Sequence, residues 1–404
     1  MTPIDSSDPV SLRRQIRAWI AENRPAKPEF LEPENFMFVE TDEQFAYLRS
    51  WQQKLYAAGY LGMDWPAEYG GGGHPAGTQN IVAQELSRAG TPAILNVIGL
   101  QWAGPVILQY GTEAQKQRML RPILSAEEIW CQGFSEPGAG SDLASATTKA
   151  EDNGHGWTVD GHKVWTTLGR FSRWMILLAR TDTAAPKYDG LSFFLFPMNV
   201  PGVDVQPLIK ITGEGGFNQV IFSGAPMPED SLLGKLGQGW PIAMATLTFE
   251  RGAAEGTGAG SGGTTPGIGV AQVVELAKRA SRNGAPAVRD PSVRDRLADM
   301  WIRETASNFA RRRTAVPALV ADRPFAIPMM SKAVGSEYVQ QLADLACRIL
   351  GPDAALWLGD PDAPDEASWP HAYMNSFAAT IGGGTSQIQR NILGERVLGL
   401  PKSK

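Results

Sequence analysis

The sequence has only two cysteines and four histidines, and this shortage excludes several kinds of site. Cys131 and Cys347 lie outside any CxxC pattern and away from histidine clusters, so neither a disulfide framework nor a zinc site is expected. The histidines show no metal-ligand spacing. We therefore predict two buried free thiols in a reducing compartment, and no bound metal.

Long apolar runs are also missing. No stretch approaches the roughly 20 apolar residues that a membrane-spanning helix needs, and no basic segment followed by an apolar one stands at the N-terminus. These absences predict a cytoplasmic protein without a membrane span. The formal net charge of -5 argues against nucleic acid or an anionic membrane as the main partner.

What is present is typical of a folded protein with more than one domain. The 404 residues exceed one ordinary folding unit, and 43% of them are hydrophobic while 20% are charged. The first third predicts helices, because apolar residues recur three and four positions apart. Four segments show this spacing: residues 11–23, 43–60, 78–90 and 111–126.

From about Ile129 the pattern changes to short β-like runs. They are separated by Gly, Pro and Asp, and occupy residues 156–169, 173–182, 191–198, 203–209 and 218–224. The sequence Val159-Asp160-Gly161-His162 predicts a turn within the first of these runs. Successive strands without helices between them predict an antiparallel sheet or a small barrel.

Helical patterns return near Gly237 and persist almost to the end of the chain. A glycine-rich stretch, residues 252–269, and an acidic loop, residues 351–370, interrupt them. The glycine-rich stretch is too rich in glycine for an undisturbed helix. The order of helices, then strands, then helices predicts an α+β fold that is mostly α.

The strongest local motif is WCQGFSEPGAGSDLASATTKA, residues 130–150. Its glycines allow backbone N–H groups to approach a ligand closely, and Ser141 offers a hydroxyl group. The glycine spacing differs from that of a Rossmann fingerprint, and no lysine follows as in a P-loop. On this evidence alone, the motif is either a ligand-binding loop or an ordinary turn.

The wider context resembles one family. Residues 135–142, SEPGAGSD, followed by Val164-Trp165-Thr166-Thr167, are similar to the flavin-binding signature of acyl-CoA dehydrogenases. Residues 60–71, 110–117 and 382–399 resemble further stretches of the same family. The resemblance implies an N-terminal helical domain at 1–127, a central β-domain at 128–236 and a C-terminal four-helix bundle at 237–404.

The resemblance also implies an activity and a set of contacts. The activity is FAD-dependent α,β-dehydrogenation of an acyl-CoA thioester to the 2-enoyl-CoA, with electrons passing to an electron-transferring flavoprotein. Ser141 is implied near the flavin and the pantetheine arm of the substrate. The residues implied at the FAD site are Gln132, Phe134, Ser135, Gly140, Ser141, Trp165, Thr167, Thr385 and Gln387. Without the resemblance, Trp165 would be interpreted as a core tryptophan on a strand.

The catalytic base is the point at which this sequence departs from many members. They carry a glutamate where this chain has Gly383, which offers only its backbone N–H to the thioester oxygen. Isovaleryl-CoA and long-chain acyl-CoA dehydrogenases carry the glutamate on a helix, just before an arginine, and Glu250-Arg251 matches that site. The resemblance thus makes Glu250 the base and Arg251 a contact of CoA. An ordinary solvated glutamate is the alternative to Glu250, and Glu255 is the second candidate base.

Other departures leave the assembly and the acyl group open. The Arg-x-x-Phe-Gly motif of the family is absent, and residues 278–286 occupy its place. Either Arg279 or Arg282 serves a pyrophosphate there, or the segment is a solvated basic turn. A tetramer is expected, either of identical subunits or with a homologous subunit. A branched, bulky or lipid-derived acyl group is favoured. The two rival functions are a flavin monooxygenase or oxidase of the same fold, and a non-catalytic partner subunit.

Overall fold

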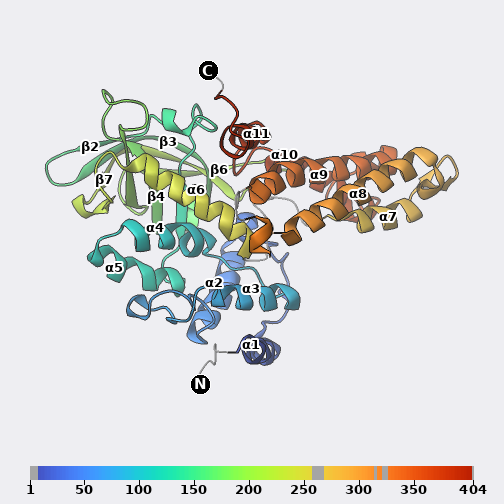
Figure 1. The fold of residues 1–404 in the computed structure, drawn as a ribbon, viewed down its shortest axis with the longest axis horizontal. Helices are drawn as coiled ribbons and strands as arrows, with labels where there is room; N and C mark the ends of the chain where they lie inside the picture. The colour runs from blue at the N-terminus through green and yellow to red at the C-terminus, as the bar shows by residue number, and fades with distance from the viewer. Residues whose placement is uncertain (1–7, 257–267, 314–315, 321–325, 403–404) are drawn as a thin grey trace. The chain divides into compact units, whose positions relative to one another are not determined.

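The computed structural model describes residues 8–256, 268–313, 316–320 and 326–402 (Figure 1). The chain divides into two compact units, Met1–Ala259 and Gly260–Lys404. The first unit combines helices with a β-sheet, and the second is almost entirely helical. This architecture confirms the predicted α+β class with a majority of helix.

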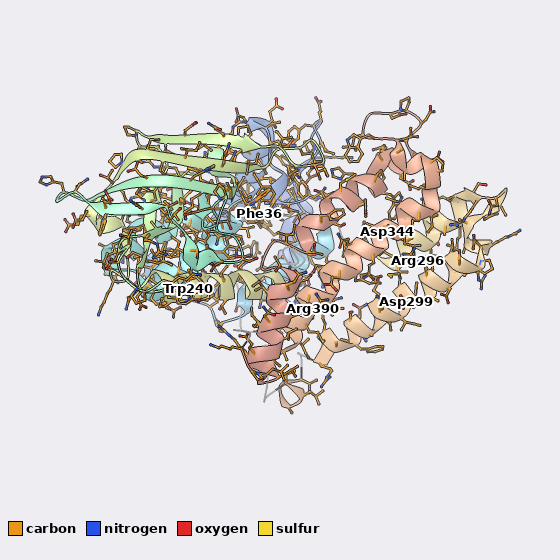
Figure 2. All side chains as sticks on the ribbon, turned by 90° about the horizontal axis from the view of Figure 1, so that it is seen from above. Phe36, Trp240, Arg296, Asp299, Asp344 and Arg390 are labelled. Carbon is orange, nitrogen blue, oxygen red and sulfur yellow. The ribbon has the colours of Figure 1, made fainter. Side chains whose placement is uncertain are left out.

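The first unit begins with helices α1 Pro9–Asn23, α2 Asp42–Ala57, α3 Thr78–Ala89, α4 Gly104–Tyr110 and α5 Glu113–Leu124, of which all but α4 were predicted. Thr41 and Thr112 begin α2 and α5 with capping boxes, in which the hydroxyl group and a glutamine side chain satisfy terminal N–H groups. The apolar side of α1 is fully buried at Leu12 and Ile16, as its spacing predicts. Phe36 belongs to a second apolar cluster of this unit, which also contains residues of α4, α5 and the sheet, and Trp240 packs against that cluster (Figure 2).

In the described residues, eight strands form one sheet in the order β6-β7-β3-β2-β4-β5-β8, with β1 paired to β4. Most pairs are antiparallel, as predicted, but β1 and β2 both run parallel to β4. Strand β5 is buried along its whole length, which explains why Ser192 is its only polar residue. The strands are β1 Trp130–Gly133, β2 Lys149–Asp152, β3 Trp157–Thr167, β4 Trp174–Arg180, β5 Leu191–Pro197, β6 Val203–Leu208, β7 Phe217–Met227 and β8 Leu232–Leu233.

The predicted turn at Asp160-Gly161 is wrong, because β3 continues through it. The register against β7 shifts here, and the Asp160 carboxylate accepts a hydrogen bond of 2.7 Å from Gly224 N–H. Gly161 has φ +153°, and a Cβ atom there would lie 2.5 Å from the Thr148 hydroxyl oxygen. The glycine therefore allows β2 to approach β3 closely, rather than reversing the chain.

Helix α6, Gly239–Gly256, closes the first unit and packs against β5 and α4. Ile242, Ala243 and Thr246 on its inner face are completely buried. The helix continues past Gly252 to Gly256, so the first residues of the glycine-rich stretch are helical. Ala253, Ala254 and Glu255 are strong helix formers that offset the glycines. The rest of the glycine-rich stretch, residues 257–267, lies outside the described residues.

The second unit contains α7 Val270–Arg279, α8 Pro291–Arg313, α9 Ala326–Leu350, α10 Ser368–Ala379 and α11 Ser386–Ile392, with a small hairpin of β9 Ser281–Arg282 and β10 Ala285–Pro286. Its core is formed by apolar residues of α7, α8 and α9. Arg296 and Asp344 connect α8 and α9, with nitrogen and oxygen 3.3 Å apart (Figure 2). No helix of the described residues is long and apolar enough to cross a membrane.

The two cysteines are free, as predicted. Cys131 lies on β1 and is fully buried, whereas Cys347 on α9 is only partly buried, contrary to the expectation for both. Burial raises the pKa of Cys131 to about 12 and that of Cys347 to about 11. Both thiols therefore stay protonated at neutral pH.

Glu85 on α3 provides a test of acid stability. Its buried carboxylate binds Arg13 and Arg17 of α1, at 2.7 and 2.6 Å. The hydrogen bond from Arg17 outweighs the opposing effect of burial and, with Arg13, lowers the pKa of Glu85 from 4.5 to about 2. The ion pairs of Glu85 with the two arginines stabilise the fold above pH 4.5, and this stabilisation is lost as the pH falls toward 2.

We expect Glu85→Gln to lower the urea concentration at the midpoint of unfolding at neutral pH. This midpoint should also change less with pH between 4.5 and 2 than in the wild type. Urea titrations of both proteins across this range measure the effect. The same slope in wild type and variant would show that Glu85 does not couple folding to protonation.

Candidate active site

The candidate cofactor residues of the first unit lie where β1 ends beside β3. Gln132 is on β1, and its buried Nε2 atom has no hydrogen-bond partner among the described residues. The buried Thr166 hydroxyl on β3 is likewise without a partner in that part of the chain. Unpaired buried polar atoms are costly, so these two groups fit a site that binds a polar ligand.

Phe134 and Ser135 follow β1 and are held by β3. The Ser135 carbonyl oxygen accepts a hydrogen bond of 2.9 Å from Val164 N–H. The ring of Phe134 is buried and packs edge-to-face on Phe193, with centroids 5.8 Å apart. The structure therefore brings the segment 134–135 next to the segment that contains Trp165.

Trp165 has an unusual backbone and an exposed ring. Its φ is +61°, and an extra residue on β3 shifts the register against β7 between Lys163 and Thr166. A tryptophan in this conformation costs on the order of 1–3 kcal/mol, which the surrounding strands must support. The side chain is 60% exposed, with its edge toward Phe217. The alternative of a core tryptophan is therefore wrong.

The loop with the GAGSD motif is open toward solvent. Gly140 and Ser141 are exposed, and a Cβ atom on Gly138 or Gly140 would meet no described atom within 4 Å. Asp142 accepts hydrogen bonds of 2.6 and 2.7 Å from Lys187. Packing within the chain does not demand glycines here, so their conformational freedom and small size remain available for a ligand.

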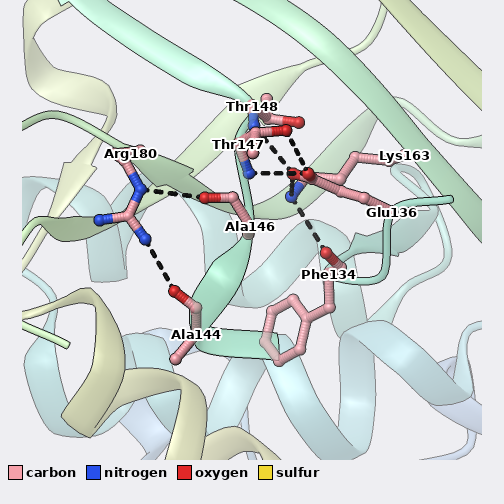
Figure 3. Close-up of polar contacts among 8 residues, drawn as sticks. All are labelled: Phe134, Glu136, Ala144, Ala146, Thr147, Thr148, Lys163 and Arg180. Carbon is pink, nitrogen blue, oxygen red and sulfur yellow. Dashed lines mark hydrogen bonds and ion pairs between the residues drawn. The ribbon is translucent and has the colours of Figure 1, made fainter. Parts of the chain in front are cut away.

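A buried ion pair, which the sequence analysis missed, supports these segments (Figure 3). The Lys163 ammonium group is completely buried and lies 2.8 Å from a carboxylate oxygen of Glu136. Burial raises the pKa of Glu136, but the charge and hydrogen bond of Lys163, together with hydrogen bonds from Thr147 and Thr148, outweigh this effect and bring the pKa to about 2. Burial lowers the pKa of Lys163 to about 8, against the opposing effect of Glu136. Both groups are therefore charged at neutral pH.

Glu250, the candidate base, lies on α6 in the first unit. It is partly buried and follows Ala243 and Thr246 at helical spacing, so it continues the face that packs inward. The Thr246 hydroxyl donates to the Ile242 carbonyl oxygen at 2.8 Å, so this buried hydroxyl group is paired within the helix. The backbone of Arg251 is helical, and its side chain lies outside the described part of the structure.

The glycine loop of the second unit is held by side chains. Gly383 and Gly384 have φ +65° and +94°. Gln389 donates to the Gly383 carbonyl oxygen at 3.0 Å, and Lys332 donates to that of Gly384 at 2.7 Å. Among the described residues, no hydrogen bond to the N–H groups of these glycines is found. The loop is thus a fixed turn whose N–H groups are available.

The remaining candidates of the second unit are Thr385 and Gln387, which follow this loop, and Arg279 and Arg282, which lie at the end of α7 and in β9. The Thr385 hydroxyl accepts from Ile388 N–H at 3.2 Å and begins α11, whereas Gln387 is exposed. Arg279 binds the Asp365 carboxylate at 2.9 Å, and Arg282 binds Asp290 at 3.0 Å. Both guanidinium groups are therefore engaged within the chain, which neither alternative for this segment anticipated.

Comparison with known proteins identifies the family. Models of the N-terminal, middle and C-terminal domains of acyl-CoA dehydrogenases match residues 12–127, 131–224 and 237–398. Acyl-CoA dehydrogenase IpdE1 of Mycobacterium tuberculosis is 37% identical over 403 residues, which cover 98% of both chains. The chain belongs to the acyl-CoA dehydrogenase family.

Two further relatives of this acyl-CoA dehydrogenase span nearly its whole length. The mitochondrial short-chain specific acyl-CoA dehydrogenase of Homo sapiens is 32% identical, and the match covers 92% of this chain and 88% of the human one. A solved structure titled "Tcur3481-Tcur3483 steroid ACAD" is 27% identical, with a TM-score of 0.77 and coverage of 99% and 100%. The resemblance predicted from the motifs is confirmed, and the enzyme is an FAD-dependent oxidoreductase.

Sequence reasoning missed the side chains that hold the candidate segments in each unit: Glu136 and Lys163 in the first, and Lys332 and Gln389 in the second. One signal was available for Lys163. Lys163 lies four residues after the buried Val159 on β3. Alternate residues of a strand point to the same side, so Lys163 points inward like Val159. A lysine at an inward position needs a buried partner, and the strand period could have indicated it.

Proposed function

We propose that this acyl-CoA dehydrogenase oxidises a bulky acyl-CoA thioester to its 2-enoyl-CoA, with Glu250 as the base. The observation that supports this assignment best is the position of Glu250. It continues the inward face of α6, while Gly383 supplies no side chain at the other base position used in the family. A carboxylate shielded from water by substrate has a raised pKa and can remove an α-proton.

The residues of the chain have separate tasks in this proposal. Gln132 and Thr166 use their unpaired polar atoms to orient FAD, and Trp165 forms a flat wall beside it. The Gly383 N–H donates a hydrogen bond to the thioester carbonyl oxygen and stabilises the negative charge that develops there. FAD held by these residues would supply the acceptor for the hydride of the β-carbon.

The remaining assignments keep their expected roles. We propose that Phe134, Ser135, Gly140, Ser141, Thr167, Thr385 and Gln387 complete the FAD site, with Ser141 also beside the pantetheine arm. Arg251 is proposed to contact CoA. An electron-transferring flavoprotein is the proposed electron acceptor.

The proposed substrate class rests on two observations. One solved relative carries the words "steroid ACAD" in its title, at 27% identity over nearly the full chain. The second is Gly383, which has no side chain where many family members carry a glutamate and so leaves more room for an acyl group. We therefore propose a polycyclic or branched, lipid-derived acyl group.

A heteromeric assembly is the second candidate, in which this chain completes its cofactor site with a homologous subunit. Arg279 and Arg282 occupy the place of the absent Arg-x-x-Phe-Gly motif and are paired with Asp365 and Asp290. The relative whose title joins two proteins, Tcur3481 and Tcur3483, supports such an assembly. Co-expression with a homologous chain, followed by mass measurement of the yellow complex, tests it.

Anaerobic titration with a panel of acyl-CoA thioesters tests the proposed function. We expect the flavin absorbance of the purified holoenzyme to bleach with sterol-derived or branched acyl-CoA and to respond weakly to short straight chains. Rapid reoxidation of the reduced flavin by air would instead favour an oxidase or monooxygenase. Bleaching by straight-chain substrates alone would contradict the proposed substrate class.

A further inference from the structure

Three chain segments that carry candidate cofactor residues meet at one buried ion pair (Figure 3). Lys163 donates to the Phe134 carbonyl oxygen at 3.0 Å and to Glu136 at 2.8 Å. It lies two residues before Trp165, at the start of the β3 bulge. One ammonium group thus connects the end of β1 to the segment that contains Trp165.

The Glu136 carboxylate closes the GAGSD loop. Its Oε2 atom accepts from Thr147 N–H at 2.7 Å and from the Thr147 hydroxyl at 2.8 Å, and its Oε1 atom accepts from Thr148 N–H at 2.9 Å. Glu136 precedes the loop and the two threonines end it, so one side chain joins both ends. A carboxylate with four donors in a buried site is strongly held.

Arg180 on β4 holds the same loop from its other side. Its guanidinium group donates to the Ala146 carbonyl oxygen at 3.0 Å and to that of Ala144 at 2.7 Å (Figure 3). Hydrogen bonds from the charged side chains of Glu136 and Arg180 therefore fix the chain before and after the exposed residues between Gly138 and Asp142. The loop itself can contact a ligand while its ends stay fixed.

We propose that the Glu136–Lys163 pair is the positioning element of the cofactor site, setting the Phe134–Ser135 segment, the GAGSD loop and Trp165 in register for FAD. The inference rests on the proposed function, because it assigns the pair a task within that site. Neither side chain is a catalytic residue, since both are enclosed by protein. They act through the backbone groups that they hold.

The chain offers a matched control. Glu85 is also a buried carboxylate bound by basic side chains, but its partners Arg13 and Arg17 are not candidate cofactor residues, and it connects α1 to α3. Glu136→Gln and Glu85→Gln remove the same charge from comparably buried sites. A merely structural role for Glu136 predicts the same effects for both variants.

The experiment compares the two variants as holoenzymes. We expect Glu136→Gln to weaken FAD binding at least about tenfold, as is usual when groups that orient a binding site are lost. Its visible circular dichroism should change, and kcat should fall about 100-fold, the effect of displacing reacting groups by about 1 Å. Glu85→Gln should lower thermal stability and leave FAD affinity, flavin spectrum and kcat unchanged.

Unchanged flavin spectrum, FAD affinity and kcat in Glu136→Gln would overturn the inference. If this variant does not fold, Glu136→Asp carries the test, because it keeps the charge but withdraws it by one methylene group. Unaltered flavin properties in Glu136→Asp would be equally decisive against the proposal. Failure of the wild-type protein to bind FAD or oxidise acyl-CoA would instead overturn the proposed function, and is seen without any variant.

Discussion

Replacing Glu250 by glutamine is expected to reduce dehydrogenation by about 10²- to 10⁴-fold, the usual contribution of a general base. Exchange of the substrate α-proton with solvent should stop as well, because the amide cannot accept that proton. FAD should remain bound, since Glu250 is assigned no contact with it. Stopped-flow flavin reduction and deuterium exchange at the α-carbon, both with the best substrate of the panel, measure these effects.

Glu255→Gln is the control for this prediction. Glu255 lies five residues further along α6 and is the second candidate base. We expect its replacement to leave proton exchange and flavin reduction near the wild-type rates. Normal turnover in the Glu250 variant, or loss of exchange only in the Glu255 variant, would remove Glu250 from the mechanism.

Lys163→Met is expected to destabilise the protein by about 3–5 kcal/mol at neutral pH, the typical effect of removing one partner of a buried ion pair. The methionine fits the volume of the lysine but leaves the Glu136 carboxylate without its countercharge and the Phe134 carbonyl without a donor. Chemical unfolding of wild type and variant, followed by circular dichroism, measures the loss.

The pH dependence of this loss identifies its cause. Without Lys163, burial dominates and raises the pKa of Glu136 relative to wild type. Acid protonates the unpaired carboxylate of the variant first, so the difference in stability should narrow as the pH falls. A constant difference at all pH values would show that packing, not charge, causes the loss.

The exposed pair Lys187–Asp142 supplies the comparison. Its lysine is 42% exposed and its aspartate 60%, although the nitrogen and oxygen lie only 2.6 Å apart. Lys187→Met should therefore cost at most about 1 kcal/mol. A similar loss of stability in Lys163→Met and Lys187→Met would mean that burial does not determine how much the Glu136–Lys163 pair contributes to the free energy of unfolding.

Local sequence pattern predicted the elements whose periodicity is complete. The 3.6-residue spacing in α1 and the apolar run in β5 reflect burial that neighbouring residues share, so both were found in place. The turn at Asp160-Gly161 failed for the opposite reason. Gly161 makes room for Thr148, the residue just before β2, and such a contact between distant parts of the chain cannot be seen in local sequence.

The candidate site also combines features that the sequence predicted with features that only the structure shows. The family motifs predicted cofactor or substrate roles for Trp165, Ser141 and the Gly383 loop, and these assignments stay proposals. The motifs did not indicate that Trp165 has a positive φ, or that Lys332 and Gln389 hold the glycine loop by its carbonyl oxygens. Those features depend on backbone groups that meet only after folding.

By itself, the sequence determined the class of fold, the family, the missing carboxylate at Gly383 and the helical glutamate at position 250. Each of these depends on residue type and spacing along the chain. Only the tertiary structure decided that Glu136 and Lys163 form a buried pair that joins three segments. Their side chains are 27 residues apart and become partners only when β1 ends beside β3. The physical reason is burial, because each buried charge is stable only beside the other. Neither residue type by itself indicates that it will be buried.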